Sequence, residues 1–593
     1  MWGLGLTLRT IFSPSSRQYY YYTMTKGQKN AAKRQKFAQK PTTEGSSEEV
    51  LLFDVKALLR KHQTTLETED VETETKLESK SNNVQSLPNR FHKIEVKISE
   101  LSSTGDGLGF IPAVNHVFVV PFTVPGDVVQ ARIVNHFPEA RYTLTDFVKI
   151  TTPGAKRDES LVKCQYFSNC AGCQMQMLPY EDQLAHKKTI IEKAYRNFSS
   201  LVQEAVPTVG DTIGSSLQYG YRTKLTPHFD GPPGSMSRKA RRDPSTRKGF
   251  EEVPPIGFQI KGMRKTIDIE DCPIGTEAVR DGLKAERERV TRDIAKYTKG
   301  ATILLRESTT RTPKDQSDQD EFSFKSSENG AGKETRLGDK EPFLGAINGP
   351  TDSSSPQANG HAVDTTPYTE IKTCITDQRA TSTEYIDSFV FKNTAGAFFQ
   401  NNNSILPQFT AYIRSQIHPP SPCLTPTSTS PSTTPAKPIN YLIDAYCGSG
   451  LFTITLSSLF ASTTGIDIAG ASITSARENA TLNDISNATF ITADAAKLFE
   501  AVTYPPNETV VIIDPPRKGC DDAFLGQLLA FAPQRVVYVS CNVHTQARDV
   551  GVLVEGRGGV KYAIESLRGF DFFPQTGHVE GVAVLRKVEA PAA

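Results

Sequence analysis

Two side chains late in the sequence have the types and the setting needed for covalent catalysis. Cys541 directly follows a short apolar run and has polar neighbours, Ser540 and Asn542, while Glu580 directly precedes another apolar run. A cysteine thiolate can add to an electron-poor carbon, and a carboxylate can later remove a proton so that the thiol leaves. The alternative for a lone cysteine is a small residue of the core. The polar neighbours of Cys541 favour the nucleophile.

Two further polar motifs stand beside this pair. Asp514-Pro515-Pro516-Arg517-Lys518-Gly519 follows another apolar run, and His578 lies two residues before Glu580. His578 is a second candidate base, and packing beside the strand is the alternative. Ligands of parallel sheets bind at the carboxyl ends of the strands. We therefore expect these motifs to face one crevice.

The elements that must position these residues are short strands alternating with helices. This alternation predicts a doubly wound, Rossmann-like α/β domain over 439–593, with an antiparallel strand at the end. Helices are expected from 451 to about 459 and over 471–482. The predicted strands are 441–444, 464–468, 489–492, 510–514, 536–540, 562–567 and 581–585.

A glycine-rich turn after the first of these strands indicates a nucleoside site. Gly448 and Gly450 follow Asp444, and Asp467 stands nineteen residues past Gly448, where an acidic residue can bind ribose hydroxyls. The turn lacks the third glycine of a dinucleotide-binding loop. It therefore favours S-adenosylmethionine over a nicotinamide cofactor, which stays the alternative.

A thiol, a carboxylate and a sulfonium methyl donor together fit methylation at carbon 5 of uracil. This carbon is a poor nucleophile until a thiolate adds to carbon 6 and generates an enolate. After methyl transfer, a base removes the carbon 5 proton so that the cysteine can leave. Three rival classes are an inert RNA-binding protein, a methyltransferase for amide or amine groups, and a nuclease. The rivals do not need this thiol–carboxylate pair.

The motifs resemble those of the RNA uracil-5-methyltransferase family, and the match runs from about Ile94 to Val588. The matching segments are 397–403, 444–450, 514–519, 540–542 and 574–580. The resemblance implies a nucleophile, Cys541, and a base, Glu580. It implies contacts to S-adenosylmethionine by Gln400, Tyr446, Asp467 and Asp514, and to the target base by Phe399 and Arg517. The family often has glutamate at the position of Asp467 and a polar residue at that of Leu451.

Four cysteines upstream form a possible metal site. Cys164, Cys170 and Cys173 have the spacing C-x5-C-x2-C, and Cys272 precedes a proline. Such thiolates suit zinc or an iron–sulfur cluster, and their spacing does not decide between these. The resemblance to the bacterial ribosomal-RNA branch of the family implies a [4Fe–4S] cluster with a structural role. Zinc and no metal are the alternatives.

The N-terminal half divides into a barrel and a central region. Short strands separated by Gly and Pro turns over 89–155 predict a small OB-like β-barrel, which resembles the TRAM type and suits single-stranded RNA; a purely structural barrel is the alternative. Its nearby basic residues are Arg132, His136 and Arg141. A central α+β region with the cysteines is expected over 156–305 and 371–405. Its basic stretch, 222–248, fits phosphate contact and a solvated loop equally well.

The remaining segments read as arms, linkers and insertions. Residues 1–40 are basic and acid-free, which favours a mitochondrial transit peptide over an RNA-binding arm or a nuclear signal. Starts at Met1 and Met24 would allow mitochondrial and nuclear or cytoplasmic forms. We expect a linker or partly helical extension over 41–88, a disordered insertion over 306–370 and a flexible one over 419–438.

The whole sequence constrains the substrate only weakly. Its 593 residues hold 67 basic and 66 acidic side chains, so net charge does not indicate a polyanionic partner. No apolar run approaches the about 18 residues of a membrane span. The long N-terminal arm and the insertions resemble eukaryotic enzymes that modify uridine 54 in the T-loop of tRNA, whereas the cysteines resemble the ribosomal-RNA branch. We expect a monomer acting on tRNA, with ribosomal RNA as the alternative.

Overall fold

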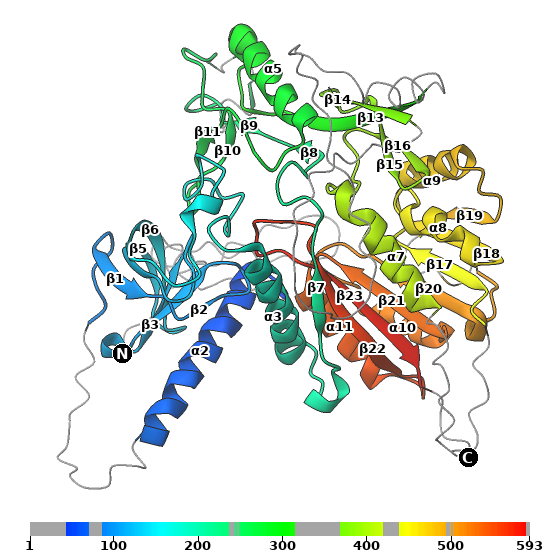
Figure 1. Ribbon diagram of the computed structural model, residues 1–593, viewed down its shortest axis with the longest axis horizontal. Helices are drawn as coiled ribbons and strands as arrows, with labels where there is room; N and C mark the ends of the chain where they lie inside the picture. Colours follow the sequence, from blue (N-terminus) through cyan, green and yellow to red (C-terminus); the bar gives the residue numbers. More distant parts are fainter. Residues whose placement is uncertain are drawn as a thin grey trace, which may run out of the picture.

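A computed structural model describes most of the chain. It covers residues 43–69, 86–235, 248–314, 368–418, 438–493 and 502–588, with the isolated positions 242, 243, 245 and 499. The predicted transit peptide, most of the insertion over 306–370 and nearly all of that over 419–438 lie outside the described residues. Figure 1 shows two folded lobes and a central region above them.

The C-terminal lobe is built on an eight-stranded sheet in the order β19-β18-β17-β20-β21-β23-β22-β7. The strands are β17 Tyr441–Ala445, β18 Ser462–Asp467, β19 Ala488–Thr492, β20 Thr509–Ile513, β21 Arg535–Ser540, β22 Tyr562–Phe570, β23 Glu580–Lys587 and β7 Gly210–Ile213. The first five in this order are parallel, and β23 pairs antiparallel with β21 and β22. The Rossmann-like sheet with its antiparallel end is therefore confirmed. The eighth strand, β7, comes from the central region and was not predicted.

Helices cover both faces of this sheet (Figure 1). Neighbouring strand residues enter different cores: Ile443 packs with one set of helices and Leu442 with the other. This alternation follows from the two-residue period of a strand. One face packs against α3 Tyr180–Phe198, α10 Asp522–Phe531 and α11 Val543–Glu555. The other packs against α7 Leu406–Ile417, α8 Leu451–Thr455 and α9 Gly470–Leu482.

The N-terminal lobe is a curled six-stranded sheet in the order β1-β5-β6-β4-β3-β2. Its strands are β1 Lys93–Lys97, β2 Glu100–Leu101, β3 Gly107–Ile111, β4 His116–Val120, β5 Val128–Phe137 and β6 Tyr142–Thr152. The sheet curls back on itself, since Ser99 N–H donates to Leu108 O over 2.8 Å. The strands lie within the segment predicted to be β-rich.

Helix α2 (Ser47–Glu69) agrees with the partly helical extension that was expected, as the alternative to a linker, over 41–88. Leu51, Val55 and Leu58 of this helix pack on the curled sheet against residues such as Tyr142. The Asp54 carboxylate also accepts hydrogen bonds from the backbone and side chain of Ser103. The sequence signal for this helix is the spacing of residues 51, 55, 58 and 59, which places them in one apolar stripe. The threonine- and glutamate-rich stretch after it obscured the stripe.

The central region consists of small sheets around helix α5 (Glu277–Asp293). They are formed by β8 Lys224–Leu225, β9 His228–Phe229, β10 Gly257–Gln259, β11 Thr266–Asp268, β12 Ala301–Thr302, β13 Leu305–Pro313, β14 Tyr368–Ile375, β15 Thr381–Ile386 and β16 Phe389–Thr394. Strand β13 pairs with β14 from Arg306 to Pro313. This pairing corrects the insertion predicted over 306–370: both of its ends are ordered strand.

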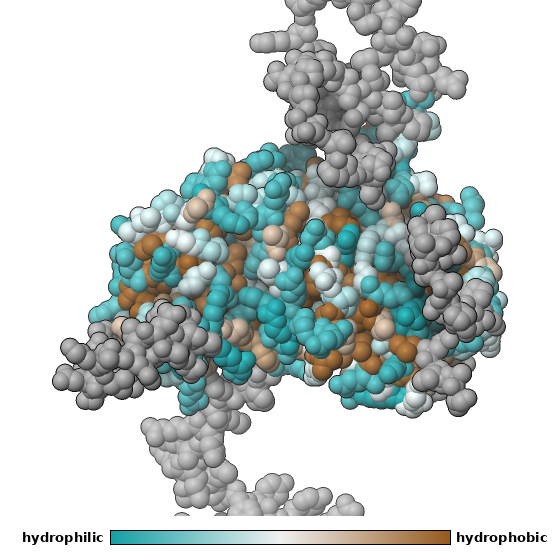
Figure 2. Space-filling view, turned by 60° about the horizontal axis from the view of Figure 1, so that its bottom comes forward, coloured by the Kyte–Doolittle hydropathy of each residue, from teal (hydrophilic) through white to brown (hydrophobic). Residues whose placement is uncertain are grey.

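No helix in the described ranges is long and apolar enough to cross a membrane. On the face shown in Figure 2, hydrophobic residues form separate patches between hydrophilic ones.

Candidate active site

Cys541 lies at the carboxyl end of β21, where the chain turns into helix α11. Asn542 caps this helix, since its side-chain oxygen accepts a hydrogen bond from His544 N–H over 3.2 Å. The Asn542 amide nitrogen also donates to Arg517 O over 2.9 Å. The residue beside the thiol thus ties two predicted motifs together.

The thiol of Cys541 is half-buried among acidic groups. Burial, with the nearby Glu580 and Asp514, raises its pKa to about 12, and Arg517 opposes this rise. The thiol is therefore protonated at neutral pH in the free protein. Any reaction through the thiolate requires this proton to leave.

Glu580 opens strand β23 and is only 2% exposed. Its neighbour Gly581 pairs with Ser540 of β21, which places the carboxylate beside the thiol. Burial raises the pKa of Glu580 well above its usual value, Asp514 raises it further, and Arg517 opposes them. A carboxylate with a raised pKa is a stronger base than a solvated one.

The predicted cofactor loop is held by Asp467 at the end of β18. One carboxylate oxygen accepts from Gly448 N–H over 3.1 Å and the other from Ala469 N–H over 2.7 Å. Tyr446, Gly448 and Gly450 have positive φ angles, so the loop turns tightly after β17. A carboxylate has about four lone-pair sites. Asp467 can thus hold the loop and still accept hydrogen bonds from ribose hydroxyls.

Two carboxyl groups lie at the bottom of this loop. Asp444 accepts from Thr453 N–H and its hydroxyl with one oxygen, while its other oxygen is buried and has no partner in the described structure. Burial raises the pKa of Asp444 and of Asp514 to about 7 each. An unpaired buried acceptor beside a glycine loop fits a ligand that brings donors or positive charge, as S-adenosylmethionine does.

Two neighbouring phenylalanines in the segment before helix α7 differ in their exposure to solvent. Phe399 is 4% exposed and packs on Phe391 in the core, whereas Phe398 is 77% exposed. The burial of Phe399 argues against the base contact expected for it. No sequence pattern distinguishes between these two adjacent aromatic residues. Gln400 follows them and is half-buried.

A cleft of about 1150 Å³ opens at Cys541. Arg517 and His578 line it together with Lys261 of the central region. Burial, together with Arg517 and other nearby cations, lowers the pKa of His578 to about 4. His578 is therefore neutral at pH 7, and a neutral imidazole can accept a proton.

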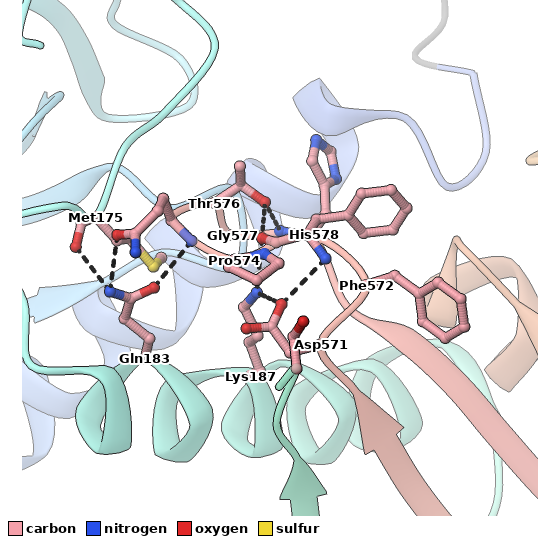
Figure 3. A network of polar contacts seen from close by, with 12 residues as sticks. Met175, Gln183, Lys187, Asp571, Phe572, Pro574, Thr576, Gly577 and His578 are labelled. Atoms are coloured by element: carbon pink, nitrogen blue, oxygen red, sulfur yellow. Dashed lines mark hydrogen bonds and ion pairs between the residues drawn. The ribbon is translucent and has the colours of Figure 1, made fainter. Parts of the chain in front are cut away.

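The loop between β22 and β23, which leads to His578 and Glu580, is held by helix α3 (Figure 3). The ammonium of Lys187 pairs with Asp571 and donates to Phe573 O over 3.0 Å. Gln183 accepts from Gln575 N–H over 3.0 Å and donates to the Gln575 side chain over 3.1 Å. In Figure 3, His578 points away from α3. The loop's geometry thus depends on residues nearly 400 positions earlier.

Replacing Lys187 with methionine should destabilise the protein strongly. Lys187 and Asp571 are both fully buried, so the substitution leaves an uncompensated carboxylate in the interior. Breaking a buried pair in this way typically costs about 3–5 kcal/mol. Urea unfolding measures the loss, and Lys188→Met, which removes a more exposed ion pair, should change stability by less than about 1 kcal/mol. Equal stabilities of the two variants would contradict the role of the buried pair.

All four predicted metal-binding cysteines are free thiols. Burial raises the pKa of each, and neighbouring cysteines raise it further for Cys170, Cys173 and Cys272. The four thiols therefore lie within electrostatic range of one another. Among the described residues, however, no group of three or more His, Cys, Asp or Glu is arranged to hold a metal ion.

The basic residues of the barrel make contacts within the lobe. Arg132 pairs with Asp146 over 2.6 Å, and His136 bonds Thr143 over 2.8 Å. Arg141 donates to the Asn115 side chain over 2.5 Å. Helix α2 also packs on an aromatic part of the sheet. These contacts reduce the area of the barrel that is free to bind RNA.

Comparison with known proteins places this site in a family. A family profile described as tRNA (uracil-5-)-methyltransferase matches residues 435–588. The tRNA (uracil(54)-C(5))-methyltransferase of Schizosaccharomyces pombe is 40% identical over 552 residues, which cover 93% of this chain and 85% of that protein. The chain belongs to the tRNA (uracil-5-)-methyltransferase family. The enzyme of the same name from Saccharomyces cerevisiae is 35% identical and covers 94% of this chain and 83% of its own.

A solved structure of an archaeal protein with a similar name has the same fold. The Pyrococcus abyssi tRNA (uracil-54, C5)-methyltransferase, in complex with S-adenosyl-L-homocysteine, superposes with a TM-score of 0.51 and 20% identity. The superposition covers 83% of this chain and all of that one. The family profile and the two fungal relatives confirm the resemblance to the uracil-5-methyltransferase family drawn from the motifs.

Proposed function

We propose that this protein transfers a methyl group from S-adenosylmethionine to carbon 5 of a uridine in RNA, namely uridine 54 in the T-loop of tRNA. The observation that carries the proposal is the grouping of Cys541, Glu580, Asp514 and Arg517 at the ends of adjacent strands. The names of the two fungal relatives support tRNA as the substrate. S-adenosylmethionine supplies the electrophilic methyl group.

The bonds change in three steps. Cys541 gives its proton to water, and its sulfur bonds to carbon 6 of the uracil, which makes an enolate. Carbon 5 then bonds to the methyl carbon as the bond from that carbon to sulfur breaks, leaving S-adenosylhomocysteine. Finally, the Glu580 carboxylate takes the carbon 5 proton, the C5=C6 double bond re-forms, and the bond from Cys541 to carbon 6 breaks.

The remaining residues would bind and orient the methyl donor and the target base. Asp467 and Tyr446 would hold the nucleoside and Asp514 the cationic end of the methyl donor, with Gln400 as a further contact. Arg517, which lines the cleft beside the thiol, would hold the target base. We assign the aromatic contact to the base to the exposed Phe398 in place of Phe399.

Mass spectrometry of nucleosides tests the proposal directly. Purified protein and S-adenosylmethionine should produce 5-methyluridine in a tRNA transcript that has uridine at position 54. A transcript with cytidine at that position should stay unmodified. Methylation of ribosomal RNA in place of the tRNA would show that the substrate is wrong.

The four cysteines are proposed to hold a [4Fe–4S] cluster with a structural role. Its support is the donor set: four half-buried, unoxidised thiols whose pKa values are raised by burial, and for Cys170, Cys173 and Cys272 also by neighbouring thiols. Zinc is the less favoured alternative.

Anaerobically purified protein should be brown, and Cys170→Ser should lose the colour. The serine hydroxyl is a poor substitute for a thiolate ligand of iron. Iron, sulfide and zinc contents measure the outcome. Cys374→Ser, which changes a cysteine outside the cluster, should keep the colour. A colourless wild-type protein with one zinc per chain would contradict the cluster.

Three proposals concern the rest of the chain. The curled sheet over 89–155 is proposed to be a TRAM-type barrel that assists RNA binding, and the central region over 156–305 and 371–405 to carry the cluster beside it. Residues 1–40 are proposed to direct the protein to mitochondria, with forms starting at Met24 in the nucleus or cytoplasm. The protein is proposed to act as a monomer. Fluorescent fusions with and without residues 1–40 test the location.

A further inference from the structure

The chain just before and within the start of helix α2 forms part of the wall of the catalytic cleft. We call residues 43–52 the entrance segment. All of it except Glu49 lines the cleft with Cys541, Arg517 and His578. The cleft is thus shaped by a segment that the catalytic motifs did not include.

The entrance segment is fixed to the residue beside the nucleophile. Gly45 O accepts a hydrogen bond from the Asn542 side chain over 3.1 Å, and Glu44 pairs with Arg548 over 2.9 Å. Gly45 has a φ of +68°, and a Cβ there would lie 2.4 Å from a Thr545 methyl group. Only glycine fits at this position against helix α11 without a shift of the neighbouring atoms.

The charge of the segment opposes polyanions. Glu48 is exposed at the cleft, and no partner for it is found in the described part of the chain. The positive end of helix α2 does not offset this charge, because the Glu49 carboxylate accepts from Gly45 N–H over 2.7 Å and the Ser46 hydroxyl from Glu49 N–H over 3.3 Å. A phosphate entering along the entrance segment meets the exposed carboxylate of Glu48.

We propose that the entrance segment is a selectivity element. It covers Cys541 on the α11 side and repels phosphate groups, so that RNA reaches the thiol only in the orientation that keeps its backbone away from this wall. Gly45 seats the segment, and Glu48 supplies the repulsion. The RNA part of this inference rests on the proposed function, whereas the covering of Cys541 does not.

Alkylation of the free protein by iodoacetamide tests the covering. Gly45→Ala should raise the rate at Cys541, relative to the buried Cys520 in the same sample, by about tenfold, because the segment must lift from α11. Gly558→Ala is the control: it has a similar φ of +62° but nothing within 4 Å of the added Cβ. An unchanged ratio in Gly45→Ala would overturn the covering, and parallel rises at both cysteines would show general unfolding instead.

Equilibrium binding tests the repulsion. Glu48→Gln should lower the Kd about two- to fivefold for RNAs that lack the cognate loop, and the change should vanish in 0.5 M salt, where the field of an exposed charge is screened. Glu555→Gln removes an exposed charge at the end of helix α11, outside the cleft, and should leave the Kd unchanged. A Kd of Glu48→Gln equal to that of the wild type at low salt would overturn the repulsion. Failure of the wild type to methylate uridine would instead reject the proposed function and leave the alkylation result standing.

Discussion

Cys541→Ala is expected to abolish both methylation and covalent attachment to RNA. In RNA with 5-fluorouridine at the target, carbon 5 carries no proton to remove, so the wild-type protein should stay bonded through Cys541 after methyl transfer. Alanine has no atom that can add to carbon 6. Loss of a catalytic nucleophile typically lowers turnover by about 10⁴- to 10⁶-fold.

The complex is detected on a denaturing gel, and peptide mass spectrometry locates the bond. Cys374→Ala, in strand β14 away from the cleft, is the matched control and should form the adduct as the wild type does. An adduct in Cys541→Ala would show that another residue is the nucleophile. No adduct in the wild type would reject the covalent route altogether.

The catalytic lobe could be predicted from the sequence because its signals are local. Each strand is a short apolar run, and each predicted site residue at a strand end follows such a run within a few positions. Parallel pairing then brings Asp444, Asp514 and Cys541 to one edge without further information. This is why residues 27 to 97 positions apart were assigned to one crevice.

Long-range contacts were the part that local patterns could not supply. Strand β7 joins the sheet through pairing with β22, about 350 residues away. Gln183 bonds Gln575 across 392 positions, and Gly45 meets Asn542 across 497. None of these residues stands in a motif whose spacing indicates its partner. The entrance segment was missed for the same reason.

Protonation states were equally inaccessible from the sequence. A thiol beside a carboxylate can have its pKa lowered or raised, depending on burial and on the cations nearby. Here burial dominates for Cys541, for Glu580 and for Asp514, and only Arg517 opposes it for the first two. In the free site Cys541 and Glu580 therefore hold their protons, and catalysis must include the loss of both to water.

Glu580→Gln is expected to stop the reaction after methyl transfer. The amide keeps the size of the carboxylate and reaches the same atoms, but it cannot take the carbon 5 proton. Cys541 should still add to carbon 6, and in this variant its pKa should fall because one nearby negative charge is gone. A methylated covalent adduct should then accumulate on ordinary uridine. Loss of a general base typically slows the affected step about 100- to 10,000-fold.

Three outcomes of this experiment separate the assignments. Glu555→Gln, at the exposed end of α11, is the control and should turn over normally. Turnover of Glu580→Gln at the wild-type rate would show that another group takes the carbon 5 proton. Its first candidate is His578, which is neutral at pH 7 because its pKa is lowered to about 4; His578→Asn should then accumulate the adduct. Absence of any adduct in Glu580→Gln would place Glu580 earlier, in binding or in thiol deprotonation. Accumulation in Glu580→Gln alone assigns the last proton transfer to the carboxylate at the start of β23.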